Sequence, residues 1–218
     1  AGIPVIYYIL PTIWAWHKSR GNVIAEYTDL AVSLFPFEAE MYKKMGTNVV
    51  YGGHPLLDTV KPSMSKDEAY SFFGLQQGKK TVLFMPGSRV QEVQSLYGKM
   101  LAAGKLLQDK VEGLQFMVPK ASTIDRHMLE EAAREANLEV HIGEERVYDM
   151  MNIADAAICA SGTATLETAL MGVPTLLVYR VNALTYWLSK ILVHLDSIGL
   201  PNIISGHRIM PELWQDEV

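Results

Sequence analysis

Apolar residues along this chain follow two alternating patterns. Short continuous apolar runs are typical of buried strands, and apolar residues three or four positions apart are typical of amphipathic helices. In the first part of the chain the runs predict strands at residues 3–9, 30–35 and 48–51. Helices are predicted at residues 18–27 and 37–45, the second one ending at Gly46. This alternation predicts an α/β fold.

A break follows at Gly52, Gly53, His54 and Pro55, and residues 61–67 form a polar, proline-containing stretch of the kind that joins domains. We therefore place a domain boundary between residues 54 and 55. Residues 1–54 are predicted to be the C-terminal part of a first α/β domain. Residues 55–218 are predicted to form a second domain with a Rossmann-like parallel sheet.

The second domain has the more regular alternation. Strands are predicted at residues 81–85, 114–118, 138–142, 156–160 and 175–179. The helix after the first of them carries an apolar stripe made of Val93, Leu96, Met100, Ala103 and Leu107. Such helices between strands imply right-handed crossovers and a parallel sheet.

Capping signals mark two further helices. Ser122 followed by Asp125 resembles a capping box at the start of a helix that runs through residue 136. Gly172 and Pro174 end the helix that follows Ser161.

Composition narrows the classes of function. The chain has 218 residues, 49% hydrophobic and 20% charged, enough for one good-sized core. Its formal net charge of −5 argues against a broad phosphate-tracking surface, so no nucleic-acid partner is expected. Cys159 stands alone in an apolar run and is predicted to be a buried core residue. The histidines show no zinc-ligand spacing, so no metal site is predicted.

Ligands of a doubly wound sheet bind beyond the carboxyl ends of the strands. One candidate loop, Pro86 to Arg89, lies directly between a predicted strand and a helix. Gly87 lets the backbone approach a ligand, Ser88 and the helix N-terminus offer donors, and Arg89 adds a positive fork for phosphate. An ordinary turn with a solvated arginine explains these four residues equally well.

A second candidate loop follows the strand at residues 156–160. Ser161, Gly162 and Thr163 supply small residues, hydroxyls and backbone N–H groups at a helix start, which suits a diphosphate. Glu167 follows within the helix beside apolar neighbours, so its carboxylate is predicted to be partly shielded and to need donors such as ribose hydroxyls. The alternative is a surface glutamate near the positive end of the helix dipole. Two such loops in one sheet favour a nucleotide diphosphate.

Two other segments carry weaker signals. Trp14, Trp16 and His17 form an aromatic cluster that suits either a cleft for a sugar or acyl chain or ordinary core packing. Residues 184–195 are unusually apolar for a helix, which fits a membrane surface, an acyl substrate or burial between domains.

An ordered set of motifs over nearly the whole chain resembles the lipid-A-disaccharide synthase family. The matching segments are residues 11–16 (PTIWAW), 35–38 (FPFE), 53–57 (GHPLL), 86–89 (PGSR), 160–167 (ASGTATLE) and 200–204 (LPNII). Each motif is weak alone, and their order makes the set specific. The resemblance implies a two-domain GT-B glycosyltransferase, of which residues 55–218 would be most of the nucleotide-sugar half.

The resemblance also implies an activity and roles for residues. Family members transfer diacylglucosamine from UDP to diacylglucosamine 1-phosphate, with inversion and without a cofactor, the UDP-sugar being a substrate. Gly87, Ser88 and Arg89 would lie at the diphosphate, together with Ser161, Gly162 and Thr163. Glu167 would bind the ribose. Arg89 and Asn202 would be the catalytic residues in this chain.

Some expectations stay open. The family's general base is expected to lie in a region that this chain lacks, and His17 stands where the family usually has arginine. The resemblance implies a cytoplasmic or peripheral inner-membrane protein, and leaves membrane contact and a homodimer undecided. Two alternatives remain, a UDP-N-acetylglucosamine 2-epimerase-like enzyme and a non-catalytic nucleotide-sugar-binding protein. The epimerase needs additional acids and bases around the sugar, which the second-domain loops do not offer.

Overall fold

The computed structural model describes residues 2–13, 20–180 and 197–218. The predictions made for Trp14, Trp16 and His17, and for residues 184–195, lie outside this part. The described residues fall into two compact units, one of residues 2–13 and 20–59, and one of residues 60–180 and 197–218. The division lies between Thr59 and Val60, so residues 55–59, which the sequence analysis gave to the second domain, group with the first.

The first unit is built on a parallel three-stranded sheet in the order β1-β2-β3. Its elements are β1 (Ile6–Tyr8), α1 (Arg20–Tyr27), β2 (Leu30–Ser33), α2 (Pro36–Lys44), β3 (Val49–Tyr51) and α3 (Leu56–Thr59). The core is made of Leu10, Ile13, Ile24, Ala31 and Tyr42. The buried Tyr42 side chain donates its hydroxyl hydrogen to the Pro11 carbonyl at 2.8 Å.

The strand predicted at residues 3–9 is only partly confirmed. β1 is shorter than predicted, and all three of its residues are exposed instead of buried. The reason is its position, because β1 is an outer strand that pairs only with β2 among the described strands.

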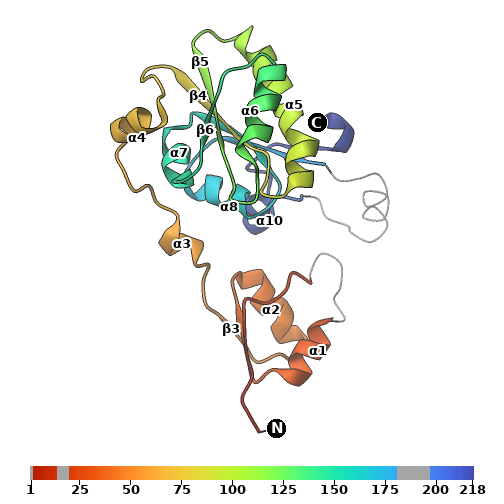
Figure 1. The fold of residues 1–218 in the computed structure, drawn as a ribbon. Coiled ribbons are helices and arrows are strands. Elements are labelled where there is room, and N and C mark those ends of the chain that lie inside the picture. The colour runs from red at the N-terminus through yellow and green to blue at the C-terminus, as the bar shows by residue number, and fades with distance from the viewer. Residues whose placement is uncertain (1, 14–19, 181–196) are drawn as a thin grey trace. The chain divides into compact units, whose positions relative to one another are not determined.

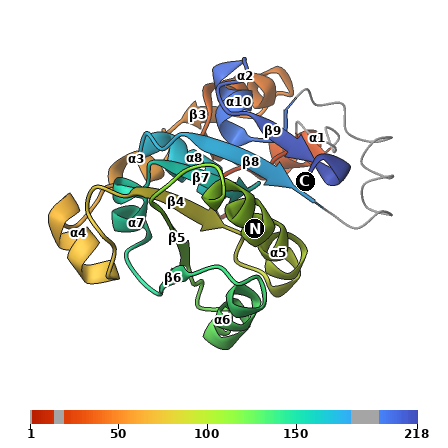
Figure 2. The ribbon, with the colours of Figure 1, turned by 90° about the horizontal axis from the view of Figure 1, so that it is seen from above.

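The second unit contains a parallel six-stranded sheet, seen edge to edge in Figure 2 in the order β6-β5-β4-β7-β8-β9. The strands are β4 (Lys80–Met85), β5 (Leu114–Pro119), β6 (Val140–Gly143), β7 (Ala156–Ala160), β8 (Thr175–Tyr179) and β9 (Glu212–Trp214). β4 neighbours both β5 and β7, so the chain first extends the sheet to one side of β4 and then to the other. This reversal is the topological switch point at which α/β proteins bind ligands.

Helices cover both faces of this sheet, as Figure 1 shows with α5 and α6 on one side and α4 and α7 on the other. The helices of this unit are α4 (Lys66–Phe73), α5 (Val90–Gln108), α6 (Arg126–Glu135), α7 (Val147–Ile153), α8 (Thr163–Leu170) and α10 (Leu200–Ser205), with a 3-10 turn at Gln215–Glu217. Each face has its own apolar core. On the α5 side, the rings of Phe84 and Phe116 stack at 5.4 Å. The predicted Rossmann-like α/β fold is confirmed.

The buried face of α5 differs from the predicted stripe. Val93, Leu96 and Met100 are buried as predicted, but Ala103 and Leu107 are only half-buried. After Met100 the buried residues of the helix are Leu101 and Gly104. A Cβ atom at Gly104 would lie 2.8 Å from Leu138 and 2.9 Å from Phe84, so the missing side chain lets the helix approach the sheet closely.

The predicted capping box at Ser122 was wrong. α6 begins at Arg126 with Asp125 as its N-cap residue, whose carboxylate accepts the His127 N–H at 2.9 Å. A capping box does occur at Ser65, in the stretch interpreted as a linker, where Ser65 and Glu68 cap each other's backbone N–H groups at the start of α4.

None of the helices in the described part of the chain is long and apolar enough to cross a membrane.

Candidate functional site

The two predicted anion loops lie next to each other at the switch point. β4 ends at Met85 and β7 ends at Ala160, and these strands are paired neighbours with the same direction. The loops that follow them therefore meet at one edge of the sheet, and both line a cavity of about 630 Å³. Of the predicted site residues, all but Asn202 line this cavity: Gly87, Ser88, Arg89, Ser161, Gly162, Thr163 and Glu167.

The first loop is shaped around a glutamate from the helix that follows it. Glu92 accepts the backbone N–H groups of Ser88 and Arg89 at 3.1 and 3.2 Å, and its other carboxylate oxygen accepts a hydrogen bond from the Arg89 guanidinium. Gly87 has a φ of 110°, and a Cβ atom there would lie 2.4 Å from a Glu92 carboxylate oxygen. Gly87 is therefore required both for the turn and for the space that Glu92 fills.

Burial acts against ionisation of Glu92, but the hydrogen bonds from Arg89 and from the N–H groups of Ser88 and Arg89 outweigh it and lower the pKa of Glu92. Glu92 is therefore an anion at neutral pH. It caps the start of α5 and pairs with the Arg89 guanidinium, whose side chain stays exposed.

The second loop presents the start of α8 to the same cavity. Gly162 is the N-cap residue of α8, and the N–H groups of the first helical residues have no acceptor within the helix. Ser161 is less available than the sequence suggested, because its backbone N–H donates to the Val178 carbonyl at 3.0 Å and its hydroxyl donates to the Ile198 carbonyl at 3.4 Å. The exposed Thr163 and the N–H groups near it are the better donors for an anion.

Glu167 is half-buried on α8, as its predicted shielding requires. One carboxylate oxygen accepts the Tyr148 hydroxyl hydrogen at 2.8 Å. Tyr148 comes from α7, so this contact ties α7 to the cavity-lining Glu167 on α8. The thiol of Cys159 is close enough to Glu167 to be affected by its charge. Burial is the main cause that raises the pKa of the Cys159 thiol to about 12, and the Glu167 charge adds to it. The fully buried Cys159 is therefore an inert core thiol, as predicted.

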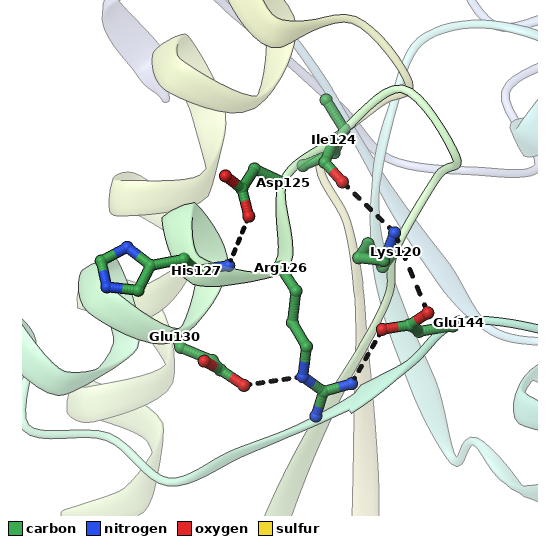
Figure 3. A network of polar contacts seen from close by, with 7 residues as sticks. All are labelled: Lys120, Ile124, Asp125, Arg126, His127, Glu130 and Glu144. Atoms are coloured by element: carbon green, nitrogen blue, oxygen red, sulfur yellow. Dashed lines mark hydrogen bonds and ion pairs between the residues drawn. The ribbon is translucent and has the colours of Figure 1, made fainter.

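Charged residues from three further segments form a network of polar contacts, of which Lys120 and Glu144 line the cavity (Figure 3). Arg126 on α6 donates to Glu130 at 2.7 Å and to Glu144, which follows β6, at 3.1 Å. Lys120, which follows β5, lies 4.0 Å from Glu144 and donates to the Ile124 carbonyl at 3.3 Å. This network holds Glu144, the first of residues 144–147, which line the cavity.

Asn202 has a different environment from the one its predicted role requires. It is buried, and its amide donates to the Met210 carbonyl and to Glu212 at 2.9 and 2.7 Å. Its amide oxygen accepts the N–H groups of Ile209 and Met210 at 2.8 and 2.9 Å. These bonds use both N–H hydrogens and the oxygen of the side chain to hold residues 209–212 against α10. Its catalytic assignment stays a prediction that this geometry does not favour.

Sequence reasoning missed three contributors to the site: Glu92 and Lys120, which line the cavity, and Tyr148, which donates to Glu167. A signal for Glu92 was present, since a glutamate three residues after a helix cap is a capping pattern. Tyr148 gave no local signal because its partner Glu167 lies 19 positions away, and Lys120 gave none because its approach to Glu144 depends on how separate segments pack. Among the described residues, no group of three or more His, Cys, Asp or Glu side chains could hold a metal ion.

Comparison with known proteins gives the chain a family. The family model described as "Lipid-A-disaccharide synthetase" matches residues 2–218. The chain belongs to the lipid-A-disaccharide synthase family. Curated members include the lipid-A-disaccharide synthases of Geobacter metallireducens, 44% identical over 217 residues, and of Syntrophus aciditrophicus, 42% identical over 215 residues. The alignments cover 100% and 98% of this chain and 56% of each relative, so the chain spans little more than half the length of these relatives.

Solved structures resemble the chain in fold. The UDP-GlcNAc 2-epimerase from Neisseria meningitidis bound to UDP-GlcNAc matches with a TM-score of 0.58 and 14% identity, over 94% of this chain and 60% of that one. The S. aureus MnaA structure with UDP matches with a TM-score of 0.55 and 15% identity, over 84% and 50%. At such identities the likeness concerns the fold alone. The sequence relatives, by contrast, carry the synthase name, so family membership favours the synthase over the epimerase alternative.

Proposed function

We propose that this chain is the donor-binding part of a glycosyltransferase that joins UDP-2,3-diacylglucosamine to 2,3-diacylglucosamine 1-phosphate, forming lipid A disaccharide and releasing UDP. The observation that carries the proposal is the meeting of two strand-to-helix loops in one cavity, with a half-buried glutamate one helical turn beyond the second loop. The choice of the two acylated sugars is our inference from membership of the lipid-A-disaccharide synthase family.

The diphosphate is assigned to the two loops. Thr163 at the start of α8 and Ser88 before the start of α5 line the cavity, and Arg89 adds a guanidinium. When UDP leaves, negative charge grows on the diphosphate. Donors that are already oriented stabilise this charge more than they stabilise the uncleaved substrate, and each is worth roughly 3–4 kcal/mol where measured in other enzymes.

The ribose is assigned to Glu167. One of its oxygens is already occupied by Tyr148, which holds the carboxylate in place and leaves the other oxygen for a hydroxyl donor. Residues 144–147 directly precede Tyr148 in sequence and line the same cavity. We assign the uracil to the side of the cavity that these residues form.

The reaction requires a base that removes the proton of the acceptor hydroxyl. We assign this role to none of the described residues, because Glu167 serves the ribose and Glu92 is tied to the first loop. The proposal includes no metal and no cofactor. Membrane contact and a homodimer remain expectations taken from the family.

The first test is calorimetry of the chain with UDP and with ADP. Binding of UDP with clear preference over ADP is expected, because the cavity should read the base as well as the phosphates. Equal affinity for both, or no binding of either, would contradict the assignment. The second test is a mass-spectrometric assay of the complete enzyme with both acylated sugars, in which absence of the disaccharide would refute the proposed reaction. Product formation would also exclude a purely non-catalytic binding protein.

A further inference from the structure

Lys120 is a largely buried lysine in the wall of the cavity. Only 15% of its side chain is exposed, and it follows β5 directly. Its ammonium can donate three hydrogen bonds, but among the described residues it has a single close acceptor, the carbonyl of Ile124 at 3.3 Å. Removing an ammonium from water is costly unless acceptors replace the water. The position of Lys120 therefore calls for a further negative partner.

Glu144 compensates the positive charge of Lys120 only in part. Its carboxylate lies 4.0 Å from the Lys120 nitrogen, beyond hydrogen-bond distance, while Arg126 donates to the same carboxylate at 3.1 Å (Figure 3). Glu144 is thus neutralised mainly by Arg126, and the charge of Lys120 is left weakly compensated.

The other cations that line the cavity are more strongly engaged. The Arg89 guanidinium is paired with Glu92. The Arg146 guanidinium donates to the Ser63 hydroxyl at 2.7 Å and lies 5.6 Å from the centre of the Phe72 ring. Both arginines are exposed, so water screens their charges, and Lys120 is the one cation among the described residues lining the cavity that is not exposed.

The loop that carries Lys120 also touches the first anion loop. The Thr123 hydroxyl donates to the Ser88 carbonyl, which joins the segment after β5 to the segment after β4. Since β5 and β4 are paired neighbours, the two loops share one edge of the sheet.

We propose that the Lys120 ammonium binds the diphosphate of the UDP-sugar, as a third contact beside the two loops. The inference rests on the proposed function, because it assumes that the cavity receives a nucleoside diphosphate. It adds a donor that no sequence motif indicated. Lys120 would turn its flexible side chain from the Ile124 carbonyl towards the phosphate oxygens, and the Glu144 carboxylate would stay with Arg126.

The test compares Lys120→Met with wild type by calorimetry, using UDP, UMP and uridine. Methionine keeps the apolar stem and removes the charge. The expected result is about tenfold weaker UDP binding, the size of one charge-assisted hydrogen bond in a partly open cavity, a smaller loss for UMP and none for uridine. Lys120→Arg should retain most of the UDP affinity, because it restores the charge.

Lys105→Met is the matched control, since Lys105 also donates to a backbone carbonyl, that of Asn137 at 3.1 Å, but does not line this cavity. It should leave all three affinities unchanged. Unchanged UDP affinity in Lys120→Met, or an equal loss for UDP and uridine, would overturn the inference. A wild-type chain that binds no UDP would instead refute the proposed function, so the two failures are distinguishable.

Discussion

Gly87 is the residue at which the first loop is most sensitive to substitution. In Gly87→Ala, the new residue would have to keep a φ of 110°, which costs a non-glycine residue roughly 2 kcal/mol. The added Cβ atom would also lie 2.4 Å from a Glu92 carboxylate oxygen and 2.8 Å from the Glu92 Cβ atom. The second contact involves the root of the side chain, which cannot swing away, so we add roughly 2 kcal/mol of overpacking. The expected loss of unfolding free energy is about 4 kcal/mol.

The assay is urea denaturation of the full chain, arranged as a double-mutant cycle with Glu92→Ala. Glu92→Ala removes the contact with the carboxylate oxygen but keeps the contact with the Glu92 Cβ atom, so it relieves part of the steric cost, and the two substitutions should couple by about 1 kcal/mol. Gly98→Ala is the control, because Gly98 lies inside α5 with no heavy atom within 4 Å of the added Cβ, and it should stabilise the chain by roughly 0.5–1 kcal/mol. A Gly87→Ala loss below about 1 kcal/mol, or strict additivity with Glu92→Ala, would refute this account of the loop.

Four further predictions concern the site and its support. Arg89→Ala should lower turnover of the complete enzyme about 100-fold with little change in melting temperature, because the guanidinium acts on the leaving diphosphate; unchanged kinetics would remove it from the mechanism. Glu167→Gln should keep part of the turnover and weaken donor binding, whereas abolished turnover at unchanged UDP affinity would make Glu167 the general base. Hydrogen bonds from Ser63 and Met64 outweigh burial and lower the pKa of Asp149. The contribution of Asp149 to stability is therefore present above about pH 4 and is lost as the pH falls through the lower native pKa. Urea denaturation should show that wild type is more stable than Asp149→Asn at pH 7 and that this difference shrinks below about pH 4, whereas a constant difference would contradict the prediction. Dialysis against EDTA should leave turnover unchanged, and loss of turnover restored by a divalent cation would show a metal requirement.

The sheet of the second unit was predictable because its strands are buried on both faces and therefore read as continuous apolar runs. β7 and β8 coincide with the predicted strands residue for residue. β9 was missed because it begins with Glu212, a buried carboxylate that accepts the N–H groups of Ile198 and Gly199 at 3.1 and 3.0 Å. When the hydrogen-bond partners of a charged strand residue come from a distant loop, the strand shows no periodic pattern of apolar residues.

The location of the site was predictable for a topological reason, and its polar pairings were not. Any loop that follows a strand next to the switch point faces the ligand edge, so Arg89 and Thr163 could be placed without knowing their partners. The hydrogen bond between Tyr148 and Glu167 spans 19 positions, and that between Asn202 and Glu212 spans 10. Such pairs depend on how separate elements pack, and composition or spacing within one element does not contain that information.

These pairings explain how a cavity lined by four glutamates can receive an anion. Glu92 is neutralised by Arg89 and two backbone N–H groups, Glu144 by Arg126, and one oxygen of Glu167 accepts from Tyr148. The fourth, Glu145, is exposed, where water and salt screen its charge. The electrostatic potential at the position of the diphosphate therefore depends mainly on the cations that these pairings leave uncompensated and on the helix N-termini, and much less on the number of acidic residues. Removing the charge of Arg126 should accordingly weaken UDP binding although Arg126 does not line the cavity, because Glu144 would then draw Lys120 to itself.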